Sequence, residues 1–196
     1  CDLAVRGLEE LIDHQEYPVV AAEVSTLSRR SLGVGYIGLA HYLAKHKVKY
    51  GDPDALKIVH ELSEQFQYYL LKASNTLAKE RGACAGFGRT KYAQGLLPID
   101  HYKKEVDELG VTNNDLKLDW EELRQSILES GLRHSTLSAQ MPSESSSVVS
   151  NATNGIEPPR DYLSVKKSKK GTLKQVVPQY SHLKSNYTLL WDMPNN

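Results

Sequence analysis

The chain has 196 residues, of which 40% are hydrophobic and 24% are charged, and its 24 basic and 24 acidic side chains give a formal net charge of zero. This composition is typical of a soluble protein with one or two cores. A neutral chain lacks the positive field that a general nucleic-acid or membrane-surface binder needs. No apolar run approaches the ~20 residues of a membrane helix.

The cysteine content and the start of the chain indicate the compartment. Cys1 and Cys84 are too few for a disulfide framework, so we expect a reducing, cytoplasmic environment. The chain begins with Cys1 and shows no signal-peptide pattern. Leucines at helical spacing follow at once, where a lipoprotein would have a polar tether. We therefore expect a piece of a longer cytoplasmic protein without a membrane partner.

The first half of the chain contains three predicted helices. Apolar spacing predicts the first from Leu3 to about Asp13, before the proline at position 18. A glycine-rich segment leads into the second, from about Ile37 to Lys45. Asp52-Pro53 combines an N-cap residue with proline at the first helical position, and so opens a long helix that Gly82 ends.

The second half mixes irregular segments, helices and short strands. Residues 83–118 are predicted to be irregular because glycine and proline interrupt them. A helix is expected from Asp119 to Ser130, with a glycine as its terminator. Polar and apolar residues alternate from Thr136 to Met141, the period of a strand. The last predicted elements are a hairpin with arms Tyr162–Val165 and Leu173–Val177 and a helix from about Tyr180 to Trp191. Long helices with isolated strands predict the α/β class.

Three motifs in the sequence have ordinary structural interpretations. The pattern from Gly33 through Gly35 to Gly38 matches the dinucleotide fingerprint, but it lacks the preceding strand and the later acidic residue. His60 and Glu61 resemble the start of a zinc-protease helix, yet glutamate replaces the second histidine, so no metal site is predicted. A basic run is interpreted as a solvated hairpin tip; it comprises Lys166, Lys167, Lys169 and Lys170.

The strongest candidate site is the stretch MPSESSSVVSNATNGIEPP, residues 141–159. A strand with a polar face ends at its Met-Pro pair, and a predicted helix begins directly afterwards. The start of a helix leaves backbone N–H groups unpaired and favours an anion, and serine hydroxyls would surround that anion here. The sequence therefore predicts a phosphate- or diphosphate-binding loop at Ser143, Glu144, Ser145 and Ser146. A helix N-cap with spare serines remains the alternative.

The stretch GLRHSTLSAQMPSESSSVVSNATNGIEPP, residues 131–159, resembles the large, catalytic subunit of class I ribonucleoside-diphosphate reductase. Further segments resemble it in the same order, among them CDLAVRGLEELIDHQEYP, QYYLLKASNTLAKERGAC, GLLPIDHYKK, LKQVVPQY and LLWDMP. The resemblance covers residues 1–196. It implies part of that family's barrel domain, from the second half of a ten-stranded α/β barrel, with Gly33–Gly38 as a strand end that enters a helix.

The resemblance also implies functional roles. The substrate's diphosphate would be held by the four loop residues Ser143, Glu144, Ser145 and Ser146. Ser145 is often threonine in relatives, whereas His134 and Gln140 depart from a commoner asparagine and apolar residue. The family reduces ribonucleoside diphosphates to deoxyribonucleoside diphosphates by a thiyl-radical mechanism. Cys1 and Cys84 match none of its radical or reducing cysteines, so no catalytic residue is expected in this chain.

The complete enzyme would need parts that this chain is not expected to supply. The resemblance implies ATP and deoxynucleotide effectors, a radical from a metal-containing small subunit, thioredoxin or glutaredoxin as reductant, and self-association of the large subunit; no cofactor is expected on this segment. Two alternatives stay open, a non-catalytic phosphate-binding module and one chain of a split reductase subunit. The near-continuous match to the diphosphate-reductase pattern disfavours the adenosylcobalamin-dependent relatives.

Overall fold

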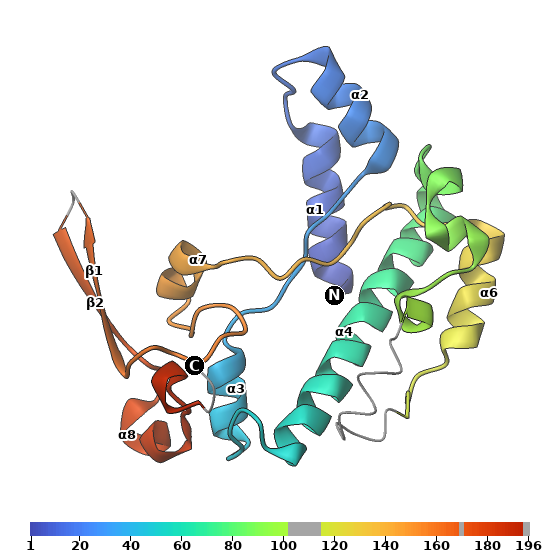
Figure 1. The fold of residues 1–196 in the computed structure, drawn as a ribbon. Coiled ribbons are helices and arrows are strands. Elements are labelled where there is room, and N and C mark those ends of the chain that lie inside the picture. Colours follow the sequence, from blue (N-terminus) through green and yellow to red (C-terminus); the bar gives the residue numbers. More distant parts are fainter. Residues whose placement is uncertain (102–114, 169–170, 194–196) are drawn as a thin grey trace. The chain divides into compact units, whose positions relative to one another are not determined.

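The computed structural model describes residues 1–101, 115–168 and 171–193 (Figure 1). The chain divides into two compact units, the first made of Cys1–Val34 and His60–Ala139 and the second of Gly35–Val59 and Gln140–Asn196. Each unit has its own hydrophobic cluster. Within these described ranges, no helix is both long enough and apolar enough to cross a membrane.

Four helices build most of the first unit: α1 (Asp2–His14), α2 (Val20–Arg29), α6 (Trp120–Ser130) and the greater part of α4 (Pro53–Arg81). The apolar spacing seen in the sequence has its expected outcome, because α1 buries Val5 and Ile12 on one face. The centre of the cluster is fully buried and includes Leu70, Leu71, Leu77, Ile127 and Leu132. The predictions of α1, α4 and α6 are confirmed.

Two extended segments of the first unit pair in parallel. The N–H of Leu32 donates to the carbonyl of Thr136 (2.9 Å), the N–H of Val34 donates to that of Leu137 (2.8 Å), and Ala139 returns a bond to Val34 (3.0 Å). Only the bridge between Val34 and Ser138 is regular, so the strand predicted to reach Met141 is shorter than expected. The predicted alternation is confirmed only at Leu137, which is buried between two residues that are not; on the same predicted face, Ala139 is half-buried and Met141 is exposed.

Residues 83–101 contain three short 3-10 turns and otherwise irregular backbone, in keeping with the irregular segment that glycine and proline predicted. The turns are η1 (Phe87–Arg89), η2 (Lys91–Gln94) and η3 (Pro98–His101). Helix α6 then begins at Asp119, whose carboxylate accepts the N–H of Glu122 (2.9 Å), and it ends at Gly131. Residues 102–114 of the predicted irregular stretch lie outside the described residues, and residues 115–118 are irregular as predicted.

The second unit contains short elements only, apart from the start of α4. Its elements are α3 (Leu39–Lys45), α7 (Glu144–Val149), the hairpin of β1 (Leu163–Ser168) and β2 (Gly171–Val176), α8 (Tyr180–Leu183), η4 (Lys184–Asn186) and η5 (Leu190–Asp192). The strands are antiparallel, with Leu163 opposite Val176. The predicted hairpin is confirmed, although Lys169 and Lys170 of its tip lie outside the described residues.

Two helix predictions need correction. Helix α2 was not expected from the sequence; its apolar residues Val20, Val24 and Leu27 recur at helical spacing, but all three are exposed in the structure. The single helix predicted from Tyr180 to Trp191 is wrong, since α8 ends at Leu183. After α8, the chain makes contacts within the second unit that a continuous helix would not allow. The hydroxyl of Tyr187 donates to the carbonyl of Pro178 (2.7 Å), and the N–H of Leu190 donates to the carbonyl of Pro159 (2.9 Å). Such contacts outweigh local helix propensity.

Candidate functional site

The serine loop, residues 141–159, is closed by a clasp around Ser143. The hydroxyl of Ser143 donates to the side-chain oxygen of Asn154 (2.8 Å), and its backbone N–H donates to the same oxygen (2.9 Å). The hydroxyl oxygen also accepts the N–H of Gly155 (2.8 Å). Ser143 is 8% exposed, so these bonds form away from solvent. The structure thus places one of the four predicted residues inside the loop as a connector.

This clasp leaves the start of helix α7 open. Ser143 occupies the N-cap position, where a serine hydroxyl would ordinarily accept an N–H from the first turn, yet it makes no such bond. Among the residues that the structure describes, the backbone N–H groups of Ser145 and Ser146 have no acceptor. Unpaired donors at one point are the chemistry that binds a phosphate or carboxylate oxygen.

The remaining hydroxyls of α7 divide into inward and outward groups. Ser147 is buried and donates to the carbonyl of Glu144 (3.1 Å), while Ser150 donates to that of Ser146 (2.6 Å). The hydroxyl of Ser146 makes only a long bond to the carbonyl of Ser143 (3.4 Å). Ser145 is exposed, and its hydroxyl has no partner within the described part of the chain. Glu144, the first residue of α7, is also exposed.

Other parts of the second unit brace the loop from both sides. The amide nitrogen of Gln175 on β2 donates to the carbonyls of Ser147 (3.3 Å) and Ala152 (3.1 Å). The N–H of Gly38 donates to the carbonyl of Thr153 (3.1 Å). Sequence reasoning found the serines but missed Gln175 and the connecting role of Asn154. The only signal was the Asn-Gly pair, which indicates a turn but not a partner for Ser143.

A pocket of the second unit lies at the other end of α7. It has a volume of about 510 Å³ and is lined by Val148 and Asn151 together with residues 173–181. None of the four predicted loop residues lines it. The candidate anion site is therefore the exposed start of α7, and this pocket is a separate feature.

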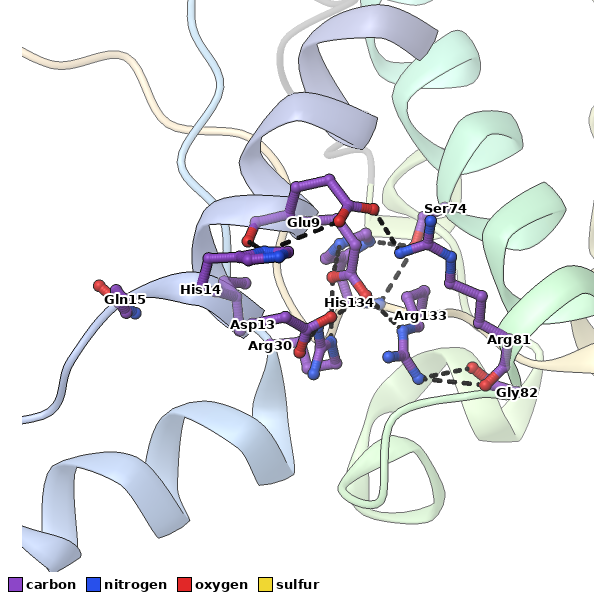
Figure 2. A network of polar contacts seen from close by, with 12 residues as sticks. Glu9, Asp13, His14, Gln15, Arg30, Ser74, Arg81, Gly82, Arg133 and His134 are labelled. Carbon is purple, nitrogen blue, oxygen red and sulfur yellow. Dashed lines mark hydrogen bonds and ion pairs between the residues drawn. The ribbon is translucent and has the colours of Figure 1, made fainter.

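A second polar group lies in the first unit and was not expected from the sequence (Figure 2). Glu9 of α1 is fully buried, and its carboxylate accepts bonds from Arg30 (2.9 Å), Arg133 (2.6 Å) and the ring of His134 (3.0 Å). Burial by itself raises the pKa of Glu9, but the hydrogen bonds from Arg30 and Arg133 outweigh it and hold that pKa below its usual value. Glu9 is therefore ionised and fully paired.

Of the residues considered for a metal, Glu61 and Glu64 have other partners, whereas the ring Nε2 of His60 is buried without a hydrogen-bond partner among the described residues. One carboxylate oxygen of Glu64 accepts the backbone N–H groups of Lys117 (2.8 Å) and Leu118 (3.0 Å) and the indole N–H of Trp120 (3.1 Å). Glu64 thus fixes the chain before α6. Across residues 1–101, 115–168 and 171–193, no group of three or more His, Cys, Asp or Glu side chains is placed to hold a metal ion.

The two cysteines lie in different environments. Cys1 is exposed, whereas Cys84 is buried. Burial raises the pKa of the Cys84 thiol above its ordinary value, and nearby backbone N–H groups offset only part of that effect. A buried thiol with a raised pKa is a poor nucleophile and a poor redox group.

Comparison with known proteins identifies the family. Residues 1–192 match the family described as ribonucleotide reductase, barrel domain. Ribonucleoside-diphosphate reductase subunit alpha of Haemophilus influenzae is 60% identical over 98% of this chain and 25% of its own length. Ribonucleoside-diphosphate reductase 1 subunit alpha of Escherichia coli is 58% identical over 94% of the chain and 24% of its own length.

A more distant relative gives the same result. Ribonucleoside-diphosphate reductase subunit alpha of Enterobacteria phage T4 is 45% identical over 98% of the chain and 25% of its own length. The chain therefore spans about a quarter of the length of these relatives. Its helices and short parallel pairing fit a partial α/β barrel, as the resemblance implied. The chain belongs to the ribonucleotide reductase barrel-domain family.

Proposed function

We propose that this chain is the part of a ribonucleoside-diphosphate reductase large subunit that holds the diphosphate of the substrate. One observation carries the proposal: Ser143 turns its hydroxyl toward Asn154 and Gly155, so that the helix start at Ser145 and Ser146 keeps open N–H donors. The names of the relatives give the substrate class, since they are ribonucleoside-diphosphate reductases.

The residues of the loop would divide the work. The N–H groups of Ser145 and Ser146 and the hydroxyl of Ser145 would donate to phosphate oxygens. A carboxylate repels a phosphate, so no side-chain contact is assigned to Glu144. Ser143 and Asn154 would hold the loop in the binding shape before the substrate arrives, which spares the ordering cost at binding. Each donor to a charged oxygen contributes roughly 1.5–3 kcal/mol.

The chemistry of the complete enzyme would come from elsewhere. We propose that residues 1–196 form part of one barrel domain that supplies binding, with the radical and reducing cysteines provided by other segments, because Cys84 is buried. The complete large subunit would self-associate in the cytoplasm. It would respond to ATP and deoxynucleotide effectors, receive its radical from a metal-containing small subunit, and be reduced by thioredoxin or glutaredoxin.

The test uses a full-length large subunit that carries this segment. Ser145→Ala should weaken cytidine diphosphate binding about 3- to 30-fold, somewhat less than the full value of a charged hydrogen bond, since the backbone donors remain. Binding of cytidine, which has no phosphate, should not change. Ser150→Ala is the matched control, because it removes an exposed hydroxyl from the other end of α7.

Isothermal titration calorimetry of both ligands separates the outcomes. Equal dissociation constants for cytidine diphosphate in the Ser145→Ala, Ser150→Ala and parent proteins would contradict the assignment. Weaker binding of cytidine as well as cytidine diphosphate in Ser145→Ala would show that the change disturbs the whole site, which also argues against a specific diphosphate contact.

A further inference from the structure

The buried cluster around Glu9 is electrically balanced. Glu9 and Asp13 carry two negative charges, and Arg30 and Arg133 carry two positive ones. The guanidinium of Arg30 contacts both carboxylates, each at 2.7 Å. His134 lies among them with no exposed surface (Figure 2). With a neutral imidazole, the four charges cancel.

The hydrogen bonds around His134 define which ring nitrogen carries the proton. Nε2 of His134 lies 3.0 Å from a carboxylate oxygen of Glu9, and an ionised carboxylate can only accept, so the proton of a neutral ring sits on Nε2. Nδ1 is then an acceptor for the hydroxyl of Ser74 (2.9 Å), whose oxygen also accepts the backbone N–H of His134 (3.1 Å). Both nitrogens of a neutral ring are satisfied by this arrangement.

A second proton would upset this balance of charge. With a proton on Nδ1, the hydroxyl of Ser74 would have to turn its hydrogen away from the ring, and the buried ring would add a positive charge beside Arg30 and Arg133. Burial lowers the pKa of His134 to about 4, because the attraction of Glu9 offsets only part of the desolvation. The charged and titratable groups on the surrounding elements are Glu9, Glu10, Asp13 and His14 of α1, Arg30 after α2, Arg81 of α4 and the adjacent Arg133.

We propose that this cluster is an acid-sensitive lock in the first unit, in which uptake of one proton by His134 releases α1 from residues 131–136. The cluster joins α1 through Glu9, α4 through Ser74, and the segment of residues 131–136 through Arg133 and His134. A positive charge on the buried ring loses its hydration and repels Arg30 and Arg133, and these effects outweigh its attraction to Glu9, so protonation favours an opened state in which the ring is solvated.

The direction of the pH effect follows from the two protonation states. His134 is neutral in the folded unit, while an unfolded histidine takes up its proton near pH 6.5. Between about pH 4 and pH 6.5, the opened state therefore binds one proton more than the folded state. The free energy that keeps α1 in place is thus complete above pH 6.5 and decreases as the pH falls. One proton corresponds to a change of about tenfold per pH unit in the opening equilibrium. Unperturbed carboxylates titrate near ~4, so the range from pH 6.5 to 5 mostly isolates histidine.

Hydrogen–deuterium exchange of the 196-residue chain, corrected for intrinsic rates, measures this opening. Amides of α1 and of residues 131–136 should exchange through an opening that rises almost tenfold per pH unit below pH 6. In His134→Gln, which retains an N–H donor toward Glu9 but does not titrate, this rise should disappear. His14→Gln is the matched control at an exposed histidine of α1 outside the cluster, and it should retain the rise.

Two outcomes would overturn the proposal. One is a His134→Gln protein whose opening has the same pH dependence as the parent. If that variant does not fold, nuclear magnetic resonance titration of the His134 ring in the parent chain decides the matter. A ring that titrates near 6.5 would show that no lock exists, while a ring that stays neutral down to pH 5 supports it.

Discussion

The buried cluster around Glu9 and the serine loop are built from similar polar groups, but these groups are paired with one another in the cluster and partly unpaired in the loop. Around Glu9, every carboxylate oxygen and ring nitrogen is directed at another group of the first unit. In the loop, the hydroxyl of Ser143 both donates and accepts inside the loop and caps no helix N–H, which leaves Ser145 and Ser146 with open donors. Polar groups that are buried and fully paired hold a fold together, whereas donors left open at the surface are available to a ligand.

The comparison is tested most strongly by Glu9→Gln. An amide at this position would direct an N–H group at the guanidinium groups of Arg30 and Arg133 and leave their charges underpaired in a closed site. We expect a loss of roughly 3–5 kcal/mol in the free energy of unfolding, the cost of removing one partner from a buried ion pair. Urea unfolding at pH 7 measures this loss.

Glu10→Gln provides the matched control on the next residue of α1. Glu10 pairs with Arg81, but both side chains are about 40% exposed or more, so solvent screens the pair. This variant should lose less than about 1 kcal/mol. Equal losses for the two variants would show that the cluster contributes no more than a surface ion pair.

Two glycines extend the comparison from side chains to the backbone. Gly131, beside the cluster, has φ +75°, and an added Cβ would lie 2.6 Å from the Cβ of Ala83. Gly131→Ala should lower the free energy of unfolding by about 2–4 kcal/mol, because strain and overlap add. Gly155 of the serine loop has φ +48°, with no atom closer than 3.8 Å, so Gly155→Ala should lose only about 1 kcal/mol. Thermal unfolding of both variants ranks them, and a reversed order would contradict the close packing at Gly131.

Within the loop, replacement of Ser143 should lower the free energy of unfolding, whereas replacement of Ser145 should leave it almost unchanged. Ser143→Ala removes a buried hydroxyl that both donates and accepts, and should lose about 1–3 kcal/mol of stability. Ser145→Ala removes an exposed hydroxyl and should change stability by less than about 0.5 kcal/mol. Urea unfolding of the pair is the measurement. A destabilised Ser145→Ala alongside an unaffected Ser143→Ala would reverse the roles assigned here.

The same contrast explains which parts of the fold and of the candidate site the sequence predicts. Apolar spacing located α1 and α4, and the turn residues located the hairpin, because periodicity reports which face is buried. The same spacing says nothing about Glu9, a charged residue on the buried face of α1 whose partners lie 21 to 125 positions away. Helix α2 was missed although Val20, Val24 and Leu27 recur at helical spacing, and these residues are exposed in the structure. The serine loop was predicted as a site, but the bond from Ser143 to Asn154 depends on how the loop folds back, which local sequence does not specify.

The smallest effect on stability and turnover is expected for a substitution at Cys84, a buried residue like those of the cluster around Glu9 and unlike the exposed serines of the loop. Its side chain is 4% exposed, and burial raises the pKa of its thiol, so little thiolate forms at neutral pH. In a full-length large subunit that carries this segment, Cys84→Ser should lose about 1 kcal/mol of stability, because a hydroxyl is harder to bury than a thiol. Its rate of cytidine diphosphate reduction should stay within about twofold of the parent, a free-energy change well under 1 kcal/mol. Cys84→Ala, which introduces no polar atom, separates packing from chemistry. A collapse of turnover in both variants, with unfolding and substrate binding unchanged, would place Cys84 in the redox chemistry and contradict its assignment as a structural residue.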